Sequence, residues 1–249
     1  MFGYDPYIQG ENMNQSGFIW DNQMALWGNP KPVGFGNPLF HVKEIDRDKA
    51  NAIIRANHYS KVVYSGSKIH LGVFAPELLG VLQFGVAMNP ASQASVVAET
   101  KEDEYLELNR MWLDDKLPRN SESRAVSCAM KFIRKKFPQI QWVQSFADER
   151  CGCYGVVYQA CNFVYCGEHT SVFWEFNGEM YHNSLMTRNP DLTPKARFIQ
   201  ENKAKAIPHK LRQFRYLYFL DRRARSRLLL KEKPYPKHGA KTDTVALGS

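Results

Sequence analysis

The stretch from Tyr105 to Cys166 limits the fold of this chain more than any other, because strand and helix patterns alternate along it. Its predicted elements are a strand over 105–113, a helix from Ser121 or Ser123 up to Phe137-Pro138, a strand over 140–147 that ends at Asp148, and a short helix over 155–163. Proline ends the first helix because its ring cannot continue the helical hydrogen bonds. Such alternation predicts neighbouring parallel strands joined by right-handed crossovers, with polar groups gathered at one edge of the sheet.

The flanking segments add further elements on both sides of this stretch. They are a strand over 39–45, a helix capped by Asp46 that ends near 57–60, antiparallel strands over 69–74 and 79–88, a hairpin across Asn177-Gly178, and two basic helices over 196–205 and 208–227. The order predicts an α/β fold (an α+β sandwich) with a mixed, mostly antiparallel central sheet, helices on both faces and basic C-terminal helices. It resembles the GNAT-type acyltransferase fold, in which two adjacent parallel strands splay apart to admit an acyl donor.

Positive charge gathers in the last quarter of the chain. Residues 188–249 hold 16 Lys/Arg and 5 Asp/Glu, a net of +11, whereas residues 1–187 hold 17 and 20, a net of −3. This asymmetry favours a polyanionic partner, with nucleic acid first and an acidic membrane surface second. We therefore expect an N-terminal arm (1–38), a GNAT-like catalytic domain (39–187), a basic helical extension for DNA contact (188–230) and a flexible tail (231–249).

Composition and missing motifs exclude several function classes. No apolar run is long enough to span a membrane, and the N-terminal residues lack the basic start and apolar stretch of a signal peptide. Five cysteines without such a signal favour a reducing, intracellular setting. The absence of GxxxxGK[ST], HExxH, HxE…PCxxC, DPPY and GxGxxG patterns argues against a nucleotide hydrolase, a metalloprotease, a deaminase and an ordinary methyltransferase.

Polar residues stand at element ends or on apolar faces, where chemistry is expected. His58 and Tyr59 follow the first predicted helix and could serve as base and orienting phenol, or as a helix-terminal His beside a core Tyr. Arg110 shares a strand face with Leu108, so it needs an anion, either a structural carboxylate or a substrate group. Asp148 ends a parallel strand, where it could act as a base, hold a metal or cap the next loop.

The helix N-terminus at residues 119–124 is a candidate anion site for a pyrophosphate-bearing cofactor. Its predicted ligands are Arg119, Asn120, Ser121, Ser123 and Arg124. The segment lacks the glycines of the acetyltransferase pattern R/Q-x-x-G-x-G/A, which weakens a coenzyme A interpretation, and a well-capped helix is the alternative. Tyr158 on the next helix could donate a proton or stack on a base, or it could be a core residue with a satisfied hydroxyl.

Metal and phosphate candidates complete the set. Four cysteines lie close together in the sequence, namely Cys151, Cys153, Cys161 and Cys166. Their spacing matches no standard zinc site, so we interpret them as small apolar residues, although His169 and His182 could complete a metal site. His58 and Asp148 are candidate iron ligands, because imidazole and carboxylate both suit iron. Near the C-terminus, aromatic residues alternate with candidate DNA-binding residues, namely Lys210, Arg212, Arg215, Arg222, Arg223 and Arg225. A solvated amphipathic helix is the alternative there.

Five short motifs, taken in order, resemble the Mom family of bacteriophage DNA-modification proteins. They are HYS at 58–60, ELNR at 107–110, SES at 121–123, SFAD at 145–148 and GVVYQACNFVYCG at 155–167, within a likeness from about His41 to Thr187. The resemblance implies a GNAT-like fold and the conversion of adenine in phage DNA to N6-carbamoylmethyladenine, which blocks host restriction enzymes. It also implies double-stranded DNA as the partner, the host cytoplasm as the location, and catalytic roles for His58, Tyr59, Arg110, Ser123, Asp148 and Tyr158.

The chemical structure of the modified adenine limits which molecule could donate the added group. The added –CH₂–C(=O)NH₂ group contains the atoms of glycine, so a glycyl donor such as glycyl-tRNA is one hypothesis and acetyl-CoA is another. In duplex DNA the adenine must be flipped out of the stack, where Tyr59 or Tyr158 could stack on it. Two other classes stay open: a coenzyme A-dependent N-acetyltransferase of a small molecule or protein, and a non-catalytic DNA-binding protein. A homodimer is a further expectation for the assembly.

Overall fold

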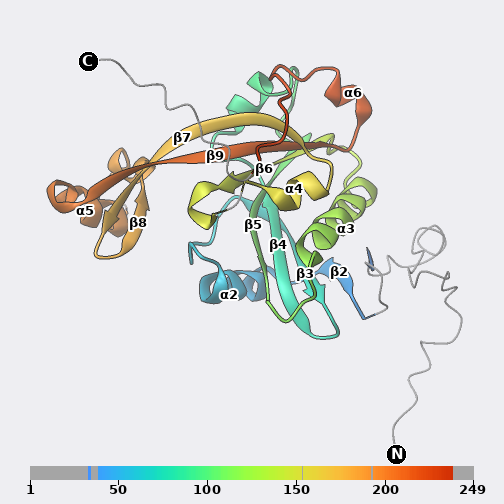
Figure 1. The fold of residues 1–249 in the computed structure, drawn as a ribbon, viewed down its shortest axis with the longest axis horizontal. Coiled ribbons are helices and arrows are strands. Elements are labelled where there is room, and N and C mark those ends of the chain that lie inside the picture. Colours follow the sequence, from blue (N-terminus) through green and yellow to red (C-terminus); the bar gives the residue numbers. More distant parts are fainter. Residues whose placement is uncertain (1–32, 35–38, 153, 192, 238–249) are drawn as a thin grey trace, which may run out of the picture. The chain divides into compact units, whose positions relative to one another are not determined.

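The structure, a computed structural model, describes residues 33–34, 39–152, 154–191 and 193–237 (Figure 1). They form two compact units, which are described separately. The first holds the described residues up to Ser145 together with 160–163 and Tyr218–Leu230; the second holds Phe146–Gln159, Val164–Leu217 and the described residues from Lys231 onward. The predicted N-terminal arm lies outside the described residues, except for Val33–Gly34. No helix in the described ranges is long and apolar enough to cross a membrane.

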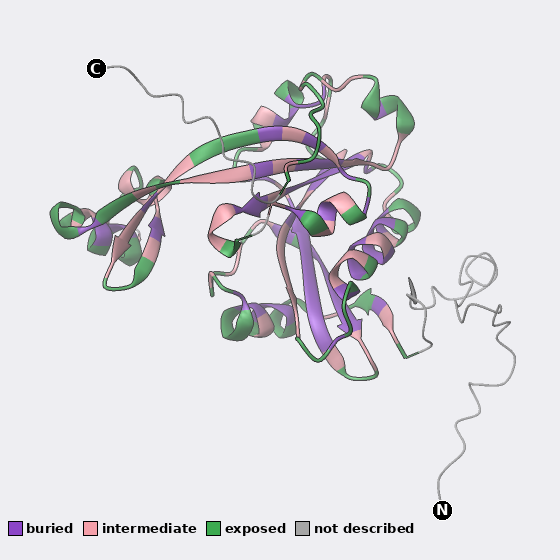
Figure 2. Ribbon diagram, in the orientation of Figure 1, coloured by how far each residue is buried: buried purple, intermediate pink, exposed green. Residues whose placement is uncertain are grey.

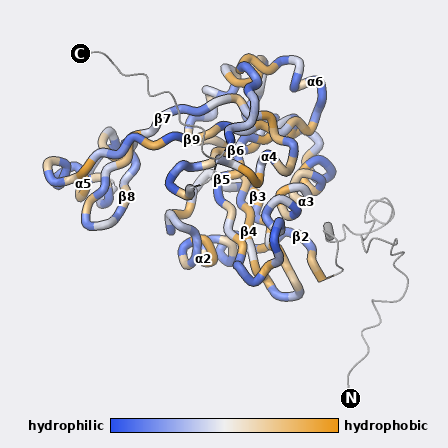
Figure 3. The backbone as a smooth tube through the Cα atoms, in the orientation of Figure 1, coloured by the Kyte–Doolittle hydropathy of each residue, from blue (hydrophilic) through white to orange (hydrophobic). Residues whose placement is uncertain are grey.

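A twisted sheet forms the centre of the first unit. Its strands are β1 (Val33–Gly34), β2 (His41–Glu44), β3 (Ser67–Phe74), β4 (Leu78–Gly85), β5 (Tyr105–Leu113) and the first residues of β6 (Trp142–Asp148). Neighbours from β1 to β5 pair antiparallel, whereas β5 and β6 pair parallel. Apolar residues run along β3 and β4, and nearly all of them are buried (Figures 2 and 3). The prediction of a mixed, mostly antiparallel sheet is confirmed.

Helices cover both faces of this sheet, as predicted. Glu44 of β2 lies opposite Leu71 of β3 and forms an ion pair with Lys136 of helix α3 (Ser121–Lys136). Asn51 of helix α2 (Arg47–Asn57) accepts a hydrogen bond from Gln83 of β4. Gln83 lies opposite His70, the neighbour of Leu71 on β3, so the two ion-pair and hydrogen-bond contacts come from opposite faces of the sheet. Because successive side chains of a strand point to opposite faces, α2 and α3 lie on opposite sides of the sheet.

The helix ends follow local rules, with one exception. Asp46 caps α2 through its carboxylate, as predicted, and α3 ends at Lys136 just before the predicted Phe137-Pro138 stop. The prediction that Ser121 or Ser123 caps α3 is wrong: the cap position is Asn120, in the left-handed conformation with φ 69° and no side-chain capping bond. Both serine hydroxyls instead donate to the carbonyl oxygen three residues earlier, a local bond that competes with capping.

Three antiparallel strands dominate the second unit. They are β7 (Val164–Phe176), β8 (Glu179–His182) and β9 (Ile207–Phe219), with β7 pairing to both of the others. Shorter elements are η3 (Glu149–Cys151), α4 (Val156–Ala160), η4 (Asn183–Met186), α5 (Pro194–Glu201) and η5 (Lys203–Lys205). The β7–β8 turn has φ 51° at Asn177 and φ 75° at Gly178, which confirms the predicted Asn-Gly hairpin.

The predicted basic helix over 208–227 is wrong. Most of that segment is β9, and only Arg222–Arg225, in the first unit, forms a short helix, α6. The physical reason lies in the apolar period. Phe214 and Tyr216 are buried two residues apart, as on one face of a strand, and aromatic side chains favour strands.

The start of the predicted flexible tail is held on the second unit. The Lys233 amide donates to the Tyr165 carbonyl at 2.9 Å, and the Tyr235 ring lies 6.5 Å from the Tyr216 ring between centroids. Residues 231–237 therefore extend the ordered part of this unit. The remainder of that prediction, residues 238–249, falls outside the described residues.

A buried polar trio lies between the first sheet and α2. The Gln83 side-chain amide donates to Oδ1 of Asn51 at 2.9 Å and to Nδ1 of His70 at 3.1 Å. Burial lowers the pKa of His70, and the charge of Arg47 lowers it further. His70 is therefore neutral in the folded chain, with Nδ1 as a hydrogen-bond acceptor.

Acid is expected to destabilise the first unit through His70. Its pKa is lower in the folded state than its usual 6.5, so the unfolded chain takes up the proton first as the pH falls. The contribution of His70 is complete above the unfolded pKa and is lost below it. Urea unfolding at about pH 7.5 and about pH 5 should show a larger loss for the wild type than for His70→Asn, which accepts the same bond without titrating. Equal losses in the two proteins would contradict this assignment.

Candidate active site

The loop after α2 holds His58 in one tautomer. His58 is buried, and its Nδ1 accepts the Ser60 backbone N–H at 3.1 Å while lying 2.9 Å from Ser60 Oγ. The loop closes on itself because the Lys61 amide donates to the His58 carbonyl at 2.8 Å. A backbone N–H can only donate, so the neutral ring carries its proton on Nε2. In this tautomer the Nε2–H is a donor, and a role of His58 as a base stays a prediction.

Tyr59 faces solvent beside this histidine. Its side chain is 57% exposed, and its ring lies 4.3 Å from the His58 ring between centroids. The alternative that Tyr59 is a core residue is therefore wrong. An exposed ring at the edge of a site is suited to stacking on a base.

Arg110 joins β5 to the His58 loop. Its Nε donates to the Val62 carbonyl at 2.8 Å, and its Nη1 donates to the Asn109 carbonyl at 2.6 Å. Arg110 of the ELNR motif thus contacts the loop that follows the HYS motif, although Arg110 and Val62 are 48 residues apart along the chain. The guanidinium holds the loop, in addition to any role towards a substrate.

A second polar network, which sequence reasoning did not single out, lies where β5 and β6 stop pairing. The parallel pairing of β5 with β6 begins where Tyr105 lies opposite Trp142. In the described part of this unit it ends where Glu107 lies opposite Gln144. Glu107 accepts hydrogen bonds from Asn109 Nδ2 at 3.2 Å and from Gln144 Nε2 at 2.8 Å. Gln144 is buried, and its Oε1 has no partner among the described residues. A glutamine inside an apolar strand pattern was the available signal.

The predicted anion loop shows mixed features. Arg119 and Arg124 are exposed, but the Ser121 hydroxyl is buried and donates to the Pro118 carbonyl. The Ser123 carbonyl accepts the Cys161 thiol at 3.0 Å, which joins the SES motif to the GVVYQACNFVYCG motif. Ser121 is therefore committed to the fold, and cofactor binding by this loop stays a prediction.

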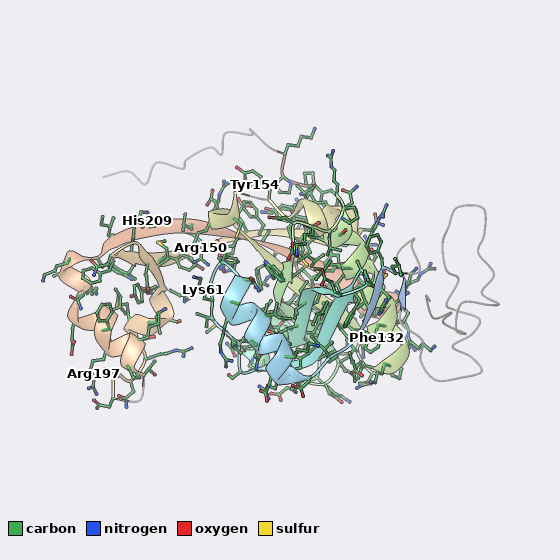
Figure 4. All side chains as sticks on the ribbon, turned by 90° about the horizontal axis from the view of Figure 1, so that it is seen from below. Lys61, Phe132, Arg150, Tyr154, Arg197 and His209 are labelled. Atoms are coloured by element: carbon green, nitrogen blue, oxygen red, sulfur yellow. The ribbon has the colours of Figure 1, made fainter. Side chains whose placement is uncertain are left out.

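Asp148 lies in the second unit, where its carboxylate binds Arg150. The carboxylate is buried, caps η3 by accepting the Arg150 amide at 3.0 Å, and accepts Arg150 Nε at 3.0 and 2.9 Å. Nη2 of Arg150, a residue labelled in Figure 4, completes the ion pair. The guanidinium lies 4.0 Å above the Phe173 ring. The capping alternative is confirmed, and a guanidinium stabilises the ionised carboxylate.

Tyr158 belongs to an aromatic cluster of the second unit. Its ring is buried and lies 5.4 Å from that of Tyr216, whose hydroxyl donates to the Tyr154 carbonyl and accepts Gln159 Nε2 at 3.0 Å. This packing agrees with the alternative of a core tyrosine. A catalytic role for Tyr158 remains a prediction.

The predicted DNA-binding cations are not equivalent. Arg212 binds Glu149 through its backbone amide, Nε and Nη2, at 2.7, 3.0 and 2.6 Å, which lowers the pKa of Glu149. Arg212 is thus part of the fold. Arg215 lies 5.1 Å above the Phe146 ring, while Lys210 is exposed. On α6, in the first unit, three arginines are exposed: Arg222, Arg223 and Arg225.

The metal predictions concern His58, Asp148, two further histidines and the cysteines. Within the described ranges, no group of three or more His, Cys, Asp and Glu side chains is placed to hold a metal. His58 and Asp148 belong to different units, and iron at these residues stays a prediction. Burial raises the pKa of Cys161 and raises that of Cys166 to about 11. Cys153 lies outside the described residues.

Comparison with known proteins gives one strong and several weak likenesses. The model of the Mom protein family matches residues 39–237. The methylcarbamoylase mom of Escherichia phage Mu is 50% identical over 209 residues, which are 82% of this chain and 87% of that protein.

Among solved structures, the ribosomal L7/L12 alpha-N-protein acetyltransferase RimL is 13% identical with a TM-score of 0.41, covering 74% of this chain and 96% of that one. Arabidopsis thaliana NAA60 in complex with acetyl-CoA is 11% identical with a TM-score of 0.44, covering 72% and 99%. Likenesses at this level carry no argument about reaction or ligand.

Proposed function

Because this chain belongs to the Mom protein family, we propose that it is a phage DNA-modifying transferase that converts adenine in DNA to N6-carbamoylmethyladenine. The observation that carries the proposal is the 50% identity with the phage Mu methylcarbamoylase along most of both chains. The modified base would protect phage DNA from host restriction enzymes. The protein would act in the host cytoplasm, where phage DNA is copied and packaged.

The proposed chemistry is an acyl transfer followed by a rearrangement. The adenine N6 attacks the carbonyl carbon of a glycyl donor, a C–N bond forms, the bond to the donor's leaving oxygen breaks, and N6 loses a proton. The new α-amine then attacks ring carbon C6 through a five-membered intermediate. As the original C6–N6 bond breaks, the attacking glycine nitrogen loses one proton and the departing N6 gains one. The glycine nitrogen thus becomes the exocyclic nitrogen and the original N6 becomes the terminal amide. Glycyl-tRNA is a donor of this class, and acetyl-CoA lacks the required amine.

The chain's own residues supply positioning and charge for these steps. His58 would act in catalysis beside Tyr59, whose exposed ring would stack on the flipped adenine. Asp148 would accept the N6 proton, with Arg150 compensating its charge beforehand. Lys210, Arg222 and Arg225, which are exposed, are the proposed phosphate contacts. Arg212 is left out because Glu149 binds it.

The function is tested by mass spectrometry of nucleosides from plasmid DNA after expression in bacteria. Wild type should yield a deoxyadenosine whose N6 carries the added –CH₂–C(=O)NH₂ group, and Asp148→Asn should not. The matched control is Asp115→Asn, an exposed carboxylate of the first unit, which should modify DNA like the wild type. Nitrogen-labelled glycine should place its label on the exocyclic nitrogen. An unmodified profile from folded wild-type protein that binds DNA would overturn the proposal.

A further inference from the structure

The His-x-Ser turn that holds His58 occurs a second time, in the second unit. Nδ1 of His182 accepts the Ser184 backbone N–H at 3.1 Å and lies 2.9 Å from Ser184 Oγ, which are the same distances as in the His58 turn. The neutral His182 ring therefore also carries its proton on Nε2. The sequence pattern indicated His182 only as a possible metal ligand beside the cysteines.

His182 is linked to Asp148 by a continuous chain of contacts within the second unit. The His182 ring packs edge-on against Phe173 with centroids 5.1 Å apart, and the Arg150 guanidinium lies 4.0 Å over the same ring. Arg150 in turn binds the Asp148 carboxylate. Phe173 itself is almost fully buried, so it fixes the positions of both polar groups.

The ring is a neutral donor. Burial lowers the pKa of His182, the charges of Arg150, His169 and Arg188 lower it further, and Asp148 raises it. At neutral pH a single N–H therefore remains, on Nε2, and no acceptor for it lies among the described residues. Nε2 of His182 is not among the buried side-chain atoms that lack a partner, so water can reach it, and a bound acceptor would take the place of that water.

We propose that His182 is a substrate-binding residue, whose Nε2–H donates to an oxygen of the substrate that carries partial or full negative charge. Two guanidiniums, of Arg150 and Arg188, act on the ring against one carboxylate, that of Asp148, and the remaining positive charge favours a negatively charged oxygen there. Such an oxygen belongs to the carbonyl of the transferred group or to a phosphate of the nucleic acid. This inference rests on the proposed function.

The simpler alternative is that His182 serves only as the cap of η4, since its ring accepts the Ser184 amide at the start of that turn. Asparagine is also a good cap, because its side-chain oxygen accepts the same amide, but it carries no imidazole N–H. His182→Asn therefore separates the two roles. His209→Asn is the matched control, because His209 is a partly exposed histidine of the same unit that pairs with Glu175.

The experiment measures adenine modification in cells and duplex affinity of the purified full chain for each variant. His182→Asn should fold like the wild type and lose modification by at least roughly ten-fold, the size of one hydrogen bond to a charged group. Unchanged DNA affinity would assign the carbonyl oxygen. Weaker affinity, with a difference that shrinks as salt is added, would assign the phosphate. Modification and affinity equal to the wild type would overturn the proposal.

A second measurement tests the proposal if His182→Asn is destabilised or if the modification assay fails. In wild-type protein labelled with ¹⁵N-histidine, the Nε2 signal of His182 should shift when an unlabelled duplex is added if the acceptor is a phosphate, or when glycine methyl ester is added if it is the carbonyl. The signal of the buried His70 should shift with neither probe. If wild-type protein makes no modified adenine, the proposed function fails, and the His182 proposal is decided by this titration and by duplex affinity. A His182 signal that shifts with neither probe, together with equal affinity, would then overturn it.

Discussion

Arg150→Met is expected to abolish adenine modification and to lower the free energy of unfolding by about 3 kcal/mol. The substitution keeps an unbranched side chain over the Phe173 ring but removes the positive charge from Asp148, which is only 7% exposed. An uncompensated buried carboxylate is costly, because burial disfavours its charged form and three guanidinium hydrogen bonds are lost. The partial exposure of Arg150 places the estimate at the low end of the usual range.

The chain contains its own control for this result. Asp221 and Arg223 repeat the same arrangement two residues apart, with the carboxylate capping a short helical turn and binding the guanidinium at 2.9 Å. That pair is exposed, so Arg223→Met should leave stability unchanged within error. Adding Asp148→Asn to Arg150→Met should restore part of the lost stability but no activity. An Arg150→Met protein as stable as the wild type in urea unfolding would contradict this account.

Gly155→Ala is expected to lower the free energy of unfolding by about 3 kcal/mol, through backbone strain of about 1 kcal/mol and overpacking of about 2 kcal/mol. Gly155 has φ +81°, a conformation that residues with a Cβ rarely adopt. An added methyl group would lie 2.7 Å from Cζ of Tyr216 and closer still to Cε2. Tyr216 is fully buried and hydrogen-bonded at its hydroxyl, so its ring cannot move away.

Gly178→Ala separates these two contributions. Gly178 has φ +75° in the β7–β8 turn, but nothing lies within 4 Å of an added methyl group. It should therefore show only the backbone strain, about 1 kcal/mol, in urea unfolding. If both alanine variants lost the same stability, the crowding against Tyr216 would be refuted. Modification of DNA should fall in Gly155→Ala in proportion to the unfolded fraction.

Local sequence rules predicted the elements whose cause is local. Asp46 caps α2, proline follows the end of α3, and Asn177-Gly178 turns the hairpin, because each effect acts within a few residues. The motif residues His58 and Asp148 were identified in the same way, from their positions at element ends. The Asp148–Arg150 pair, two residues apart, could also have been read from the sequence, because Asp221–Arg223 shows it as a recurring local cap.

Other predictions failed where non-local partners decide. The segment 208–227 has helix-compatible spacing of charges, yet Phe214 and Tyr216 become buried because β7 supplies an antiparallel neighbour. Ser121 and Ser123 are good caps in isolation, but both hydroxyls bond earlier carbonyls. In each case the competing interaction was not visible in the pattern of one segment.

By itself, the sequence determined the order of strands and helices as far as the β7–β8 hairpin, the family, and which residue types stand at the element ends. Only the tertiary structure decided which charged side chains belong to the fold and which are left for a substrate. Arg212 binds a carboxylate 63 residues away, and Arg110 binds a carbonyl 48 residues away. Those partners are chosen by packing of distant segments, since the free energy of burying a charge depends on what lies beside it in space rather than along the chain.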